Sequence, residues 1–386
     1  MITGDATYLK NLNRRIILEH IVASPGLSRA ELAKITGLNK ATITSQISTL
    51  LEEGLLLESG TPSHSFVGRK PIPLTLNKNA GCALGIDLDS DHANLLLTDL
   101  SGKRLQQKTV QFSDRKPETI IEELHQTIHA FSSGSIGPLV GIGLGIHGIV
   151  DHDEQVIFIP RLEWTIADVK QRLQQKHQVP VFVDNNANLS AYAERVYCYP
   201  VHNLISISAY SGIGLGMIIN DQIYRGMDGF AGEVGHMIVV PQGKPCPCGN
   251  HGCWERYASD QHALLFLADT LGVDSLTWEE VKRGINRGAP IEQEMNQLLM
   301  YWVVGLNNVI NIFNPEILIL NSSLARVFPE FVTQIKTRLQ SRMTHCRVLA
   351  TSTLGKNACA LGGAALAIRQ FLGVERLDFM KNDPAS

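Results

Sequence analysis

The sequence lacks any uninterrupted apolar run that approaches the roughly 18 residues a membrane-spanning helix needs. Its first residues, MITGDATYLK, also lack the charged-then-apolar pattern of a secretory signal peptide. These absences argue against a membrane protein and against a secreted one. We therefore expect a cytoplasmic chain without a membrane partner.

Charge is also scarce, since Asp, Glu, Lys and Arg make up 18% of the 386 residues and the net charge is −3. A uniformly basic or acidic chain is excluded, but the charge is uneven. Residues 1–80 carry nine lysines and arginines against six acidic residues, whereas the remainder carries 25 against 31. A basic beginning on an acidic body predicts a nucleic-acid-binding module fused to another unit. The length allows two or three domains.

Cysteine is infrequent, with seven residues, and four scattered ones are expected to be small buried side chains: Cys82, Cys198, Cys346 and Cys359. The other three, Cys246, Cys248 and Cys253, share a loop rich in Gly and Pro, and His236 lies nearby. Three thiolates and one imidazole form the closed tetrahedral set that a structural zinc prefers, so we predict a zinc site. The alternatives are free thiols beside a core histidine and, less favoured without a secretion signal, a disulfide.

Two carboxylates flank this set, because Glu233 stands three residues before His236 and Glu255 two residues after Cys253. A bound metal would hold both side chains in fixed positions. Carboxylates on a rigid scaffold accept strong hydrogen bonds from hydroxyl groups, which suits a polyol. We therefore interpret the metal as structural and the carboxylates as the ligand-facing part.

The first part of the chain has the pattern of a helix-turn-helix. Helices are predicted over residues 13–23, 28–36 and 39–53, with a capping box at Ser28 and a cap at Asn39. The third helix has one apolar face and one polar face, which suits contacts with base edges and phosphates. A plain three-helix bundle is the alternative. The residues predicted to contact DNA here are Ser28, Arg29, Asn39, Lys40, Thr42, Thr44, Ser45 and Gln46.

A wing is predicted after the third helix. Residues 55–57 and 72–76 read as paired strands, and the stretch between them contains a flexible basic element with Arg69 and Lys70. Such an element suits a minor groove or a phosphate contact. A solvated linker is the alternative.

From Gly81 onward, short apolar strands alternate with amphipathic helices, which is typical of an α/β layered body. Two units each open with hairpins and continue as α/β, so we expect an architectural duplication without a detectable sequence repeat. The expected parts are a winged helix-turn-helix domain over 1–79 and a body over 80–386, divided into a first lobe (80–190), a second lobe with the zinc site (191–371) and a C-terminal segment (372–386).

These motifs are specific enough to suggest a family. Gly232-Glu-Val-Gly-His236, followed by Cys-x-Cys-Gly-Asn-x-Gly-Cys-x-Glu ending at Glu255, resembles the ROK family of repressors, open reading frames and sugar kinases. The resemblance extends over essentially the whole chain, including the winged helix that the kinases lack. It implies an N-terminal all-α winged helix-turn-helix followed by a two-lobed α/β body of the actin-like, sugar-kinase (ribonuclease H-like) type.

The resemblance also implies roles for individual residues. The family's structural zinc is held by one His and three Cys, which match His236, Cys246, Cys248 and Cys253. The sugar lies between the lobes, and the implied sugar-binding residues are Asn185, Asn186, Glu233, His236 and Glu255. His147 stands where family members often have proline, and it either contacts the ligand or only fills the turn.

Three positions depart from the pattern of the kinases. Asn186 stands where the kinases have an aspartate that acts as general base, and a neutral amide cannot take a proton at physiological pH. The phosphate turn is replaced by residues 87–91, whose carboxylates would repel a triphosphate. A late Gly-Gly is Asn321-Ser322 here, although the glycines at 212, 214, 362 and 363 remain.

We therefore expect a sugar-responsive transcriptional repressor and no enzyme activity. A homodimer or higher homo-oligomer would bind palindromic double-stranded operator DNA and release it when sugar binds between the lobes. The resemblance favours xylose as inducer, although the residues themselves do not separate a pentose from a hexose. The alternative is an ATP-dependent sugar kinase with a fused DNA-binding arm. A protein partner docking on the body is neither supported nor excluded.

Overall fold

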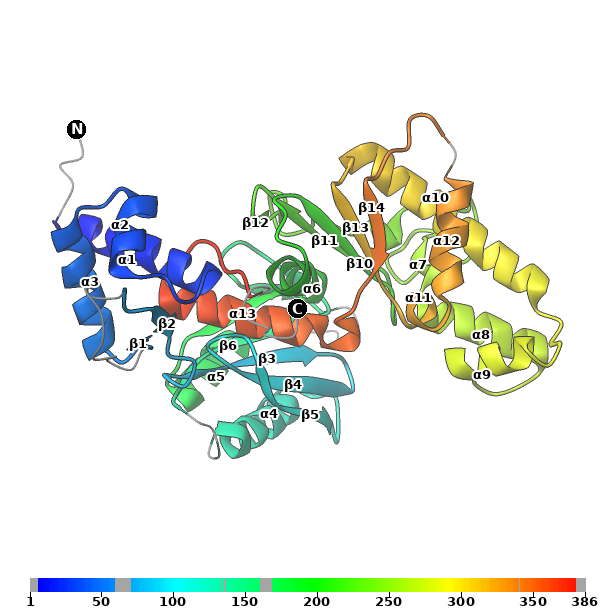
Figure 1. Ribbon diagram of the computed structural model, residues 1–386. Coiled ribbons are helices and arrows are strands. Elements are labelled where there is room, and N and C mark those ends of the chain that lie inside the picture. Colours follow the sequence, from blue (N-terminus) through cyan, green and yellow to red (C-terminus); the bar gives the residue numbers. More distant parts are fainter. Residues whose placement is uncertain are drawn as a thin grey trace.

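The computed structural model describes residues 6–59, 71–132, 134, 137–159, 169–339 and 341–379. A small N-terminal domain is joined to a body of two α/β lobes, each built on a five-stranded sheet (Figure 1). The predicted fold class is confirmed. Within the described ranges, no helix is long and apolar enough to cross a membrane.

The N-terminal domain, here called the reading head, contains three helices and a two-stranded sheet: α1 (Ala6–Ala23), α2 (Arg29–Thr36), α3 (Lys40–Glu52), β1 (Leu56–Glu58) and β2 (Leu74–Leu76). The predicted caps are present, because Ser28 and Glu31 form a capping box at α2 and the Asn39 side chain accepts a backbone N–H of α3. These bonds satisfy amide groups that a helix leaves free at its start. Strands β1 and β2 pair as the wing requires, but Arg69 and Lys70 lie outside the described residues.

The first lobe contains a sheet in the order β5-β4-β3-β6-β9. Its strands are β3 (Cys82–Leu88), β4 (His92–Asp99), β5 (Arg104–Gln111), β6 (Leu139–Ile146) and β9 (Val181–Asn185), and β7 (Ile149–Val150) pairs with β8 (Val156–Phe158). Its helices are α4 (Pro117–Ser132), α5 (Val169–His177) and α6 (Asn186–Ala193), which continues as a π-helical turn η1 (Glu194–Cys198). Side chains of β3 alternate between faces, so Leu84 and Ile86 pack in the core with α4 whereas Gly85 faces α13 (Ala358–Leu372).

The second lobe repeats this plan with the order β12-β11-β10-β13-β14. In each sheet, the first three strands pair antiparallel and the last two join in parallel. Its strands are β10 (Leu204–Ser208), β11 (Gly214–Ile219), β12 (Gln222–Ile223), β13 (Ile317–Asn321) and β14 (Val348–Thr351). Its helices are α7 (Glu255–Ala258), α8 (Asp260–Leu271), α9 (Trp278–Ile285), α10 (Glu292–Phe313), α11 (Ser323–Val327) and α12 (Pro329–Arg338). The duplication expected from the sequence is therefore present in the strand order.

Helices α6 and α13 connect the lobes, because they pack on each other while α13 lies on β3 and β6 and α6 lies on β10 and β11 (Figure 1). Glycines allow this close approach. A Cβ at Gly143 would lie 2.0 Å from the Gly363 carbonyl oxygen, and one at Gly216 would lie 2.1 Å from that of Ala187. The expected second lobe, 191–371, included α13, but the structure places this helix on the first sheet. Contacts between distant parts of the chain decide its position.

Candidate functional site

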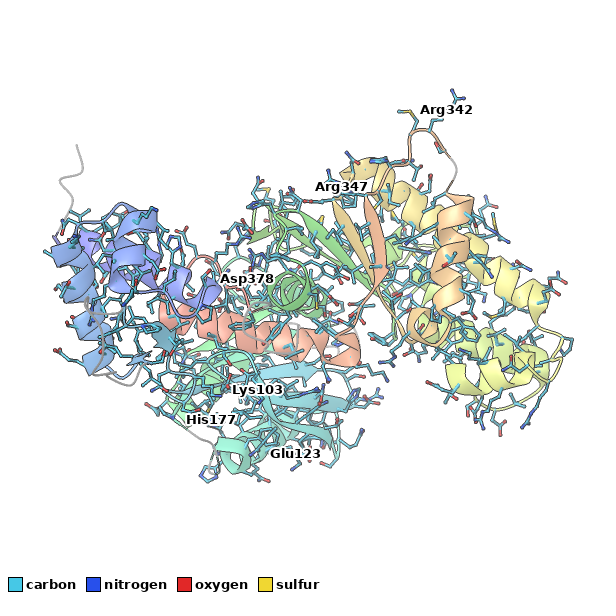
Figure 2. All side chains as sticks on the ribbon, in the orientation of Figure 1. Lys103, Glu123, His177, Arg342, Arg347 and Asp378 are labelled. Carbon is cyan, nitrogen blue, oxygen red and sulfur yellow. The ribbon has the colours of Figure 1, made fainter. Side chains whose placement is uncertain are left out.

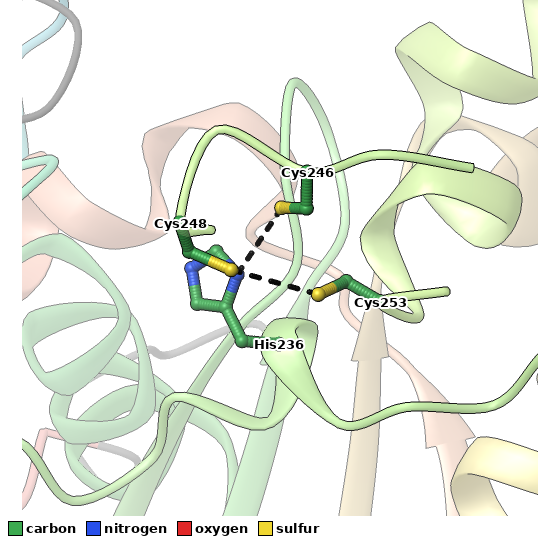
Figure 3. A group of neighbouring side chains, drawn as sticks. All are labelled: His236, Cys246, Cys248 and Cys253. Carbon is green, nitrogen blue, oxygen red and sulfur yellow. Dashed lines mark hydrogen bonds between the residues drawn. The ribbon is translucent and has the colours of Figure 1, made fainter. Parts of the chain in front are cut away.

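His236, Cys246, Cys248 and Cys253 converge in the second lobe, with their ligand atoms all within 4.8 Å of one another (Figure 3). His236 ends a short 3-10 turn that begins at Val234, and the cysteines come from the following loop. Cys248 Sγ lies 3.6 Å from Cys253 Sγ, and His236 Nδ1 lies 3.6 Å from Cys246 Sγ. The structure thus brings together all four residues predicted as metal ligands.

Backbone packing and burial hold this loop in place. Gly252 has a φ of +87°, and a Cβ there would lie 1.7 Å from the Val240 carbonyl oxygen, so only glycine permits the approach. The next two residues, Cys253 and Trp254, are both 0% exposed. The last cysteine is therefore anchored in the core of the second lobe.

The donor set fits a tetrahedral metal. With Zn–S bonds of about 2.3 Å and Zn–N bonds of about 2.0 Å, tetrahedral geometry separates two thiolates by about 3.8 Å and a thiolate from a nitrogen by about 3.5 Å. The observed separations of 3.6 Å lie close to both values. His236 would bind through Nδ1, which leaves its Nε2 free to face Glu233 Oε2 at 3.7 Å. The four residues can therefore hold a metal while His236 still presents one nitrogen away from it.

Both predicted carboxylates border the metal cluster. Glu255 begins α7, and its Oε1 accepts a hydrogen bond from Cys246 Sγ at 3.4 Å. Its other oxygen lies against the turn before β11, since a Cβ at Gly212 would be 2.8 Å from Oε2. The Glu233 side chain is more exposed, at 42% against 18% for Glu255. The structure thus groups Glu233, His236 and Glu255 around one edge of the cluster.

The other two predicted sugar-binding residues lie where β9 meets α6. Asn185 caps α6, because its Oδ1 accepts the Ala187 N–H at 2.7 Å, and its Nδ2 donates to the Gly148 carbonyl at 2.8 Å. Its side chain thus ties the helix start to the β6–β7 turn. Asn186 instead faces His147, with 3.4 Å between Asn186 Nδ2 and His147 Nδ1. A direct contact of either asparagine with sugar stays a prediction.

His147 also links Asn186 to the acidic residues at the end of β3. Its Nε2 lies 3.0 Å from Asp87 Oδ1, and its Nδ1 lies 3.9 Å from Asp89 Oδ2. His147 is therefore a hydrogen-bonded member of the site wall and does more than fill a turn.

A polar cleft of about 620 Å³ opens between the lobes beside these residues. Its first-lobe wall includes Asp87, Asp89 and Asp91, and its second-lobe wall includes Tyr210 and Asn321. The Tyr210 hydroxyl donates to Asn321 Oδ1 at 2.7 Å. Burial raises the pKa of Tyr210, so the phenol stays protonated. This cleft is acidic and rich in hydrogen-bonding groups.

The residues leading into β11 lie between the metal cluster and the junction of β9 with α6. Ser211 lines the cleft, Gly212 lies against Glu255, and a Cβ at Gly214 would lie 3.0 Å from the Ala187 Cβ. The predicted sugar-binding residues therefore flank one short segment from two sides, with His236 and the glutamates on one side and the asparagines on the other.

An ion pair between the lobes was missed by the sequence reasoning. Arg225 follows β12 and pairs with Asp184, which is 1% exposed and lies directly before Asn185. Asp184 also accepts a hydrogen bond from Asn188 Nδ2 at 3.0 Å. The available signal was the one charged residue in the strand Val181–Asn185, but its partner lies far along the chain.

The predicted DNA-contacting residues separate into two groups. Asn39, Lys40, Thr44 and Ser45 are exposed, and Arg29 and Thr42 are half-buried. Gln46 departs from the prediction, because it is 6% exposed and packs on the core side of α3. Ser28 is 4% exposed and its hydroxyl bonds to the Glu31 carboxylate, so its role is to cap α2.

Comparison with known proteins gives matches over both parts of the chain. Residues 83–370 match the ROK family, and residues 10–56 match a winged helix-turn-helix DNA-binding family. A xylose repressor of Bacillus subtilis (strain 168) is 36% identical over 381 residues, which cover 96% of this chain and 98% of the relative.

Two solved structures have the same body. A ROK family transcriptional regulator, described as a homolog of the Escherichia coli MLC protein, matches with a TM-score of 0.81 and 24% identity, covering 94% of this chain and 96% of that one. A ROK family glucokinase from Streptomyces griseus, in complex with glucose and AMPPNP, matches with a TM-score of 0.66 and 26% identity, covering 75% and 100%. The family match over most of the body, with similarity to a relative along nearly its full length, shows that this chain belongs to the ROK family.

Proposed function

We propose that this chain is a sugar-responsive transcriptional repressor with xylose as its inducer. The observation that carries the proposal is the reading head fused to a ROK body, in an order shared with a relative named xylose repressor over nearly the whole of both chains. The exposed polar residues of α3 suit a DNA major groove. The sugar would bind near Asn186, Glu233, His236 and Glu255, where amide, imidazole and carboxylate groups hydrogen-bond hydroxyls.

We further infer that the metal is a structural zinc and that the protein binds its operator as a homodimer. Three thiols and an imidazole whose ligand atoms lie within 4.8 Å of one another support zinc, since soft ligands in a closed set favour that ion. When bound, zinc would fix the loop that carries Glu255 relative to the turn that carries Glu233. A dimer would present two reading heads to two half-sites of a palindrome.

A sugar kinase is the second candidate, because the body matches a ROK glucokinase over that protein's full length. Two features of this chain argue against it. Asn186 offers no base at the position where the kinases carry aspartate, and it faces His147 in the cleft. The cleft wall also carries Asp87, Asp89 and Asp91, whose charges oppose a triphosphate.

The test is a gel shift of the purified protein on its own upstream DNA, titrated with xylose, glucose, N-acetylglucosamine and ATP. We expect xylose to release the DNA, ATP to have no effect and no sugar-dependent ATP hydrolysis to occur. Phosphoryl transfer to a sugar at an enzymatic rate would favour the kinase. Release by another of the sugars would keep the repressor and change the inducer.

The variant Glu255→Gln tests the site itself. We expect unchanged operator affinity and roughly tenfold weaker sugar affinity, the size expected when a hydrogen bond to a charged group is lost. The matched control is Glu279→Gln, an exposed glutamate of α9 in the same lobe. Metal content is measured for both variants, so that loss of the metal is not mistaken for loss of sugar contact. An unchanged sugar response in a metal-loaded Glu255→Gln protein would remove Glu255 from the site.

A further inference from the structure

Asp221, at the turn between β11 and β12, contacts two arginines and a histidine. Its carboxylate accepts hydrogen bonds from Arg195 at 2.8 and 3.2 Å, His202 Nδ1 lies 2.5 Å away, and Arg376 Nη1 lies 3.6 Å away. Burial favours protonation of Asp221, but hydrogen bonds from Arg195 and His202 outweigh it and lower the pKa below its usual value. Arg195 is only 2% exposed, so its buried positive charge needs the carboxylate of Asp221 as a partner. Charged and polar contacts of Asp221 thus hold the turn between β11 and β12 against Arg195, His202 and Arg376.

Arg376 belongs to a segment after α13, residues 374–379, that we call the C-terminal strap. The strap contacts the reading head through α1. The backbone N–H groups of Glu375 and Arg376 donate to Glu19 Oε1 at 2.7 and 3.4 Å, and Arg15 pairs with Glu375 at 2.5 Å. The first helix of the reading head is therefore held at two points by the strap.

The strap is also fixed to the body. The Leu377 carbonyl accepts a hydrogen bond from Arg195 Nη1 at 2.6 Å, and the Phe379 N–H donates to the Val196 carbonyl at 3.1 Å. Leu377 and Phe379 are 1% and 5% exposed. Figure 2 labels Asp378 of this segment, which lies between the reading head and the two lobes. The strap is thus a packed part of the molecule that spans the junction.

The other end of β12 reaches the candidate sugar site. This strand has two residues, and Arg225 follows closely after it. Arg225 pairs across the lobes with Asp184, which lies directly before Asn185 and Asn186. The Arg225 carbonyl also accepts the Ala231 N–H at 3.1 Å, just ahead of Glu233. One short strand therefore separates a salt bridge at the sugar site from a salt bridge at the strap.

We propose that β12 and the strap form a relay that couples the sugar site to the reading head, with Arg225 and Arg376 as its positioning residues. The relay rests on the proposed function, since it assigns the route by which that site regulates DNA binding. Sugar between the asparagines and the glutamates changes how β9 sits against the loop after Arg225. Asp184, which pairs with Arg225, and Arg195, which pairs with Asp221, are both buried, so separating either of these pairs is strongly unfavourable. The change therefore moves β12, the strap and α1 together.

The first test needs no ligand. Hydrogen exchange of the Glu375 and Arg376 amides, which Glu19 holds, is measured in wild type and in Arg225→Lys, which keeps the charge but loses the forked geometry. We expect exchange about threefold faster in the variant, the factor expected for weakening one partly exposed ion pair. The matched control is Arg347→Lys, whose residue pairs with Glu316 at 3.2 Å in the second lobe, away from the strap (Figure 2). Unchanged strap exchange in Arg225→Lys, or an equal effect of Arg347→Lys, would overturn the relay.

The second test uses Arg376→Gln, at a residue whose side chain is 39% exposed and whose loss leaves the buried pairs intact. We expect sugar affinity and sugar-free operator affinity within about twofold of wild type, while the factor by which xylose weakens operator binding falls about threefold. An unchanged factor would contradict the relay. If xylose leaves the wild-type complex intact, the proposed inducer fails, and the exchange experiment still decides the relay.

Discussion

At the scale of single residues, the two ring nitrogens of His236 show how one side chain could serve both the proposed metal and the proposed sugar. Its Nδ1 lies in the thiol cluster and its Nε2 faces Glu233. A metal on one nitrogen fixes the tautomer, so the other nitrogen carries a proton and donates. A hydroxyl placed between Nε2 and the carboxylate would receive one hydrogen bond and donate another. In the proposed site, a bound metal would therefore set the chemistry of the sugar contact without touching the sugar.

Removing a thiolate tests this arrangement. We expect Cys246→Ser to lower the metal content and to destabilise the second lobe, because metal binding and folding of such loops are coupled. The measurements are metal content by mass spectrometry and thermal unfolding. Cys198→Ser is the control, since this cysteine lies outside the cluster and bonds to Thr353 Oγ1 at 3.5 Å. A folded, metal-free Cys246→Ser protein with wild-type stability would contradict a structural metal.

The convergence of His236 with the three cysteines could be predicted from residue types and spacing, because three cysteines in one short loop with a histidine just before it favour a common site. The pair of Asp184 and Arg225 could not, because charge complementarity across lobes appears only after folding. Asn185 is a third case. The sequence singled it out as a sugar-binding residue, but its helix-capping role could not be predicted because an asparagine side chain has many possible partners.

At the scale of elements, local signals determine the reading head. The caps at Ser28 and Asn39 lie where the sequence predicts them, because each depends on a few neighbouring residues. Gln46 was placed wrongly since α3 packs more of its surface than a three-helix pattern indicates. The position of α13 was also missed, because glycines on distant strands decide where it lies.

Helix α3, proposed to contact DNA, gives a test at this scale. Lys40, exposed in the first turn of α3, is expected to contact phosphate, so Lys40→Ala should weaken operator binding and reduce the slope of log affinity against log salt by about one. The measurement is operator affinity at several salt concentrations. Lys103→Ala, at an exposed lysine of the first lobe, is the control and should change neither value (Figure 2). An unchanged salt slope for Lys40→Ala would show that Lys40 does not contact phosphate.

At the scale of the whole molecule, the reading head and body do not have separate cores. Ile17, Leu18 and Ile21 of α1 belong to the same hydrophobic cluster as Leu377, Phe379 and the buried face of α13. Such a shared core favours cooperative behaviour, in which a structural change in one domain alters the packing of the other. It also means that a local electrostatic cost should appear in the stability of the entire chain.

Protonation of His177 in the folded protein is one such electrostatic cost. It is half-buried at the end of α5, with its Nε2 3.2 Å from His125 Nδ1. Burial lowers its pKa to about 4, and the positive charges of His125, His129 and Lys176 add to the effect. Glu122 of α4 faces the same contact through its ion pair with Lys176. The folded protein therefore resists a proton that the unfolded chain accepts near pH 6.5.

His177 is therefore expected to lower the stability of the folded protein as the pH falls. Above about pH 6.5, His177 is neutral in both states and has no effect. As pH falls from there towards 4, the unfolded state binds the proton first, so the free energy of unfolding decreases, by at most about 2 kcal/mol after allowing for solvent screening. Denaturant unfolding between pH 7 and 5 should therefore show a weaker dependence in His177→Gln than in wild type. The control, His345→Gln, removes an exposed histidine of the second lobe and should leave the wild-type dependence in place. Equal pH dependence in wild type and His177→Gln would show that the contact between α4 and α5 does not exclude the proton.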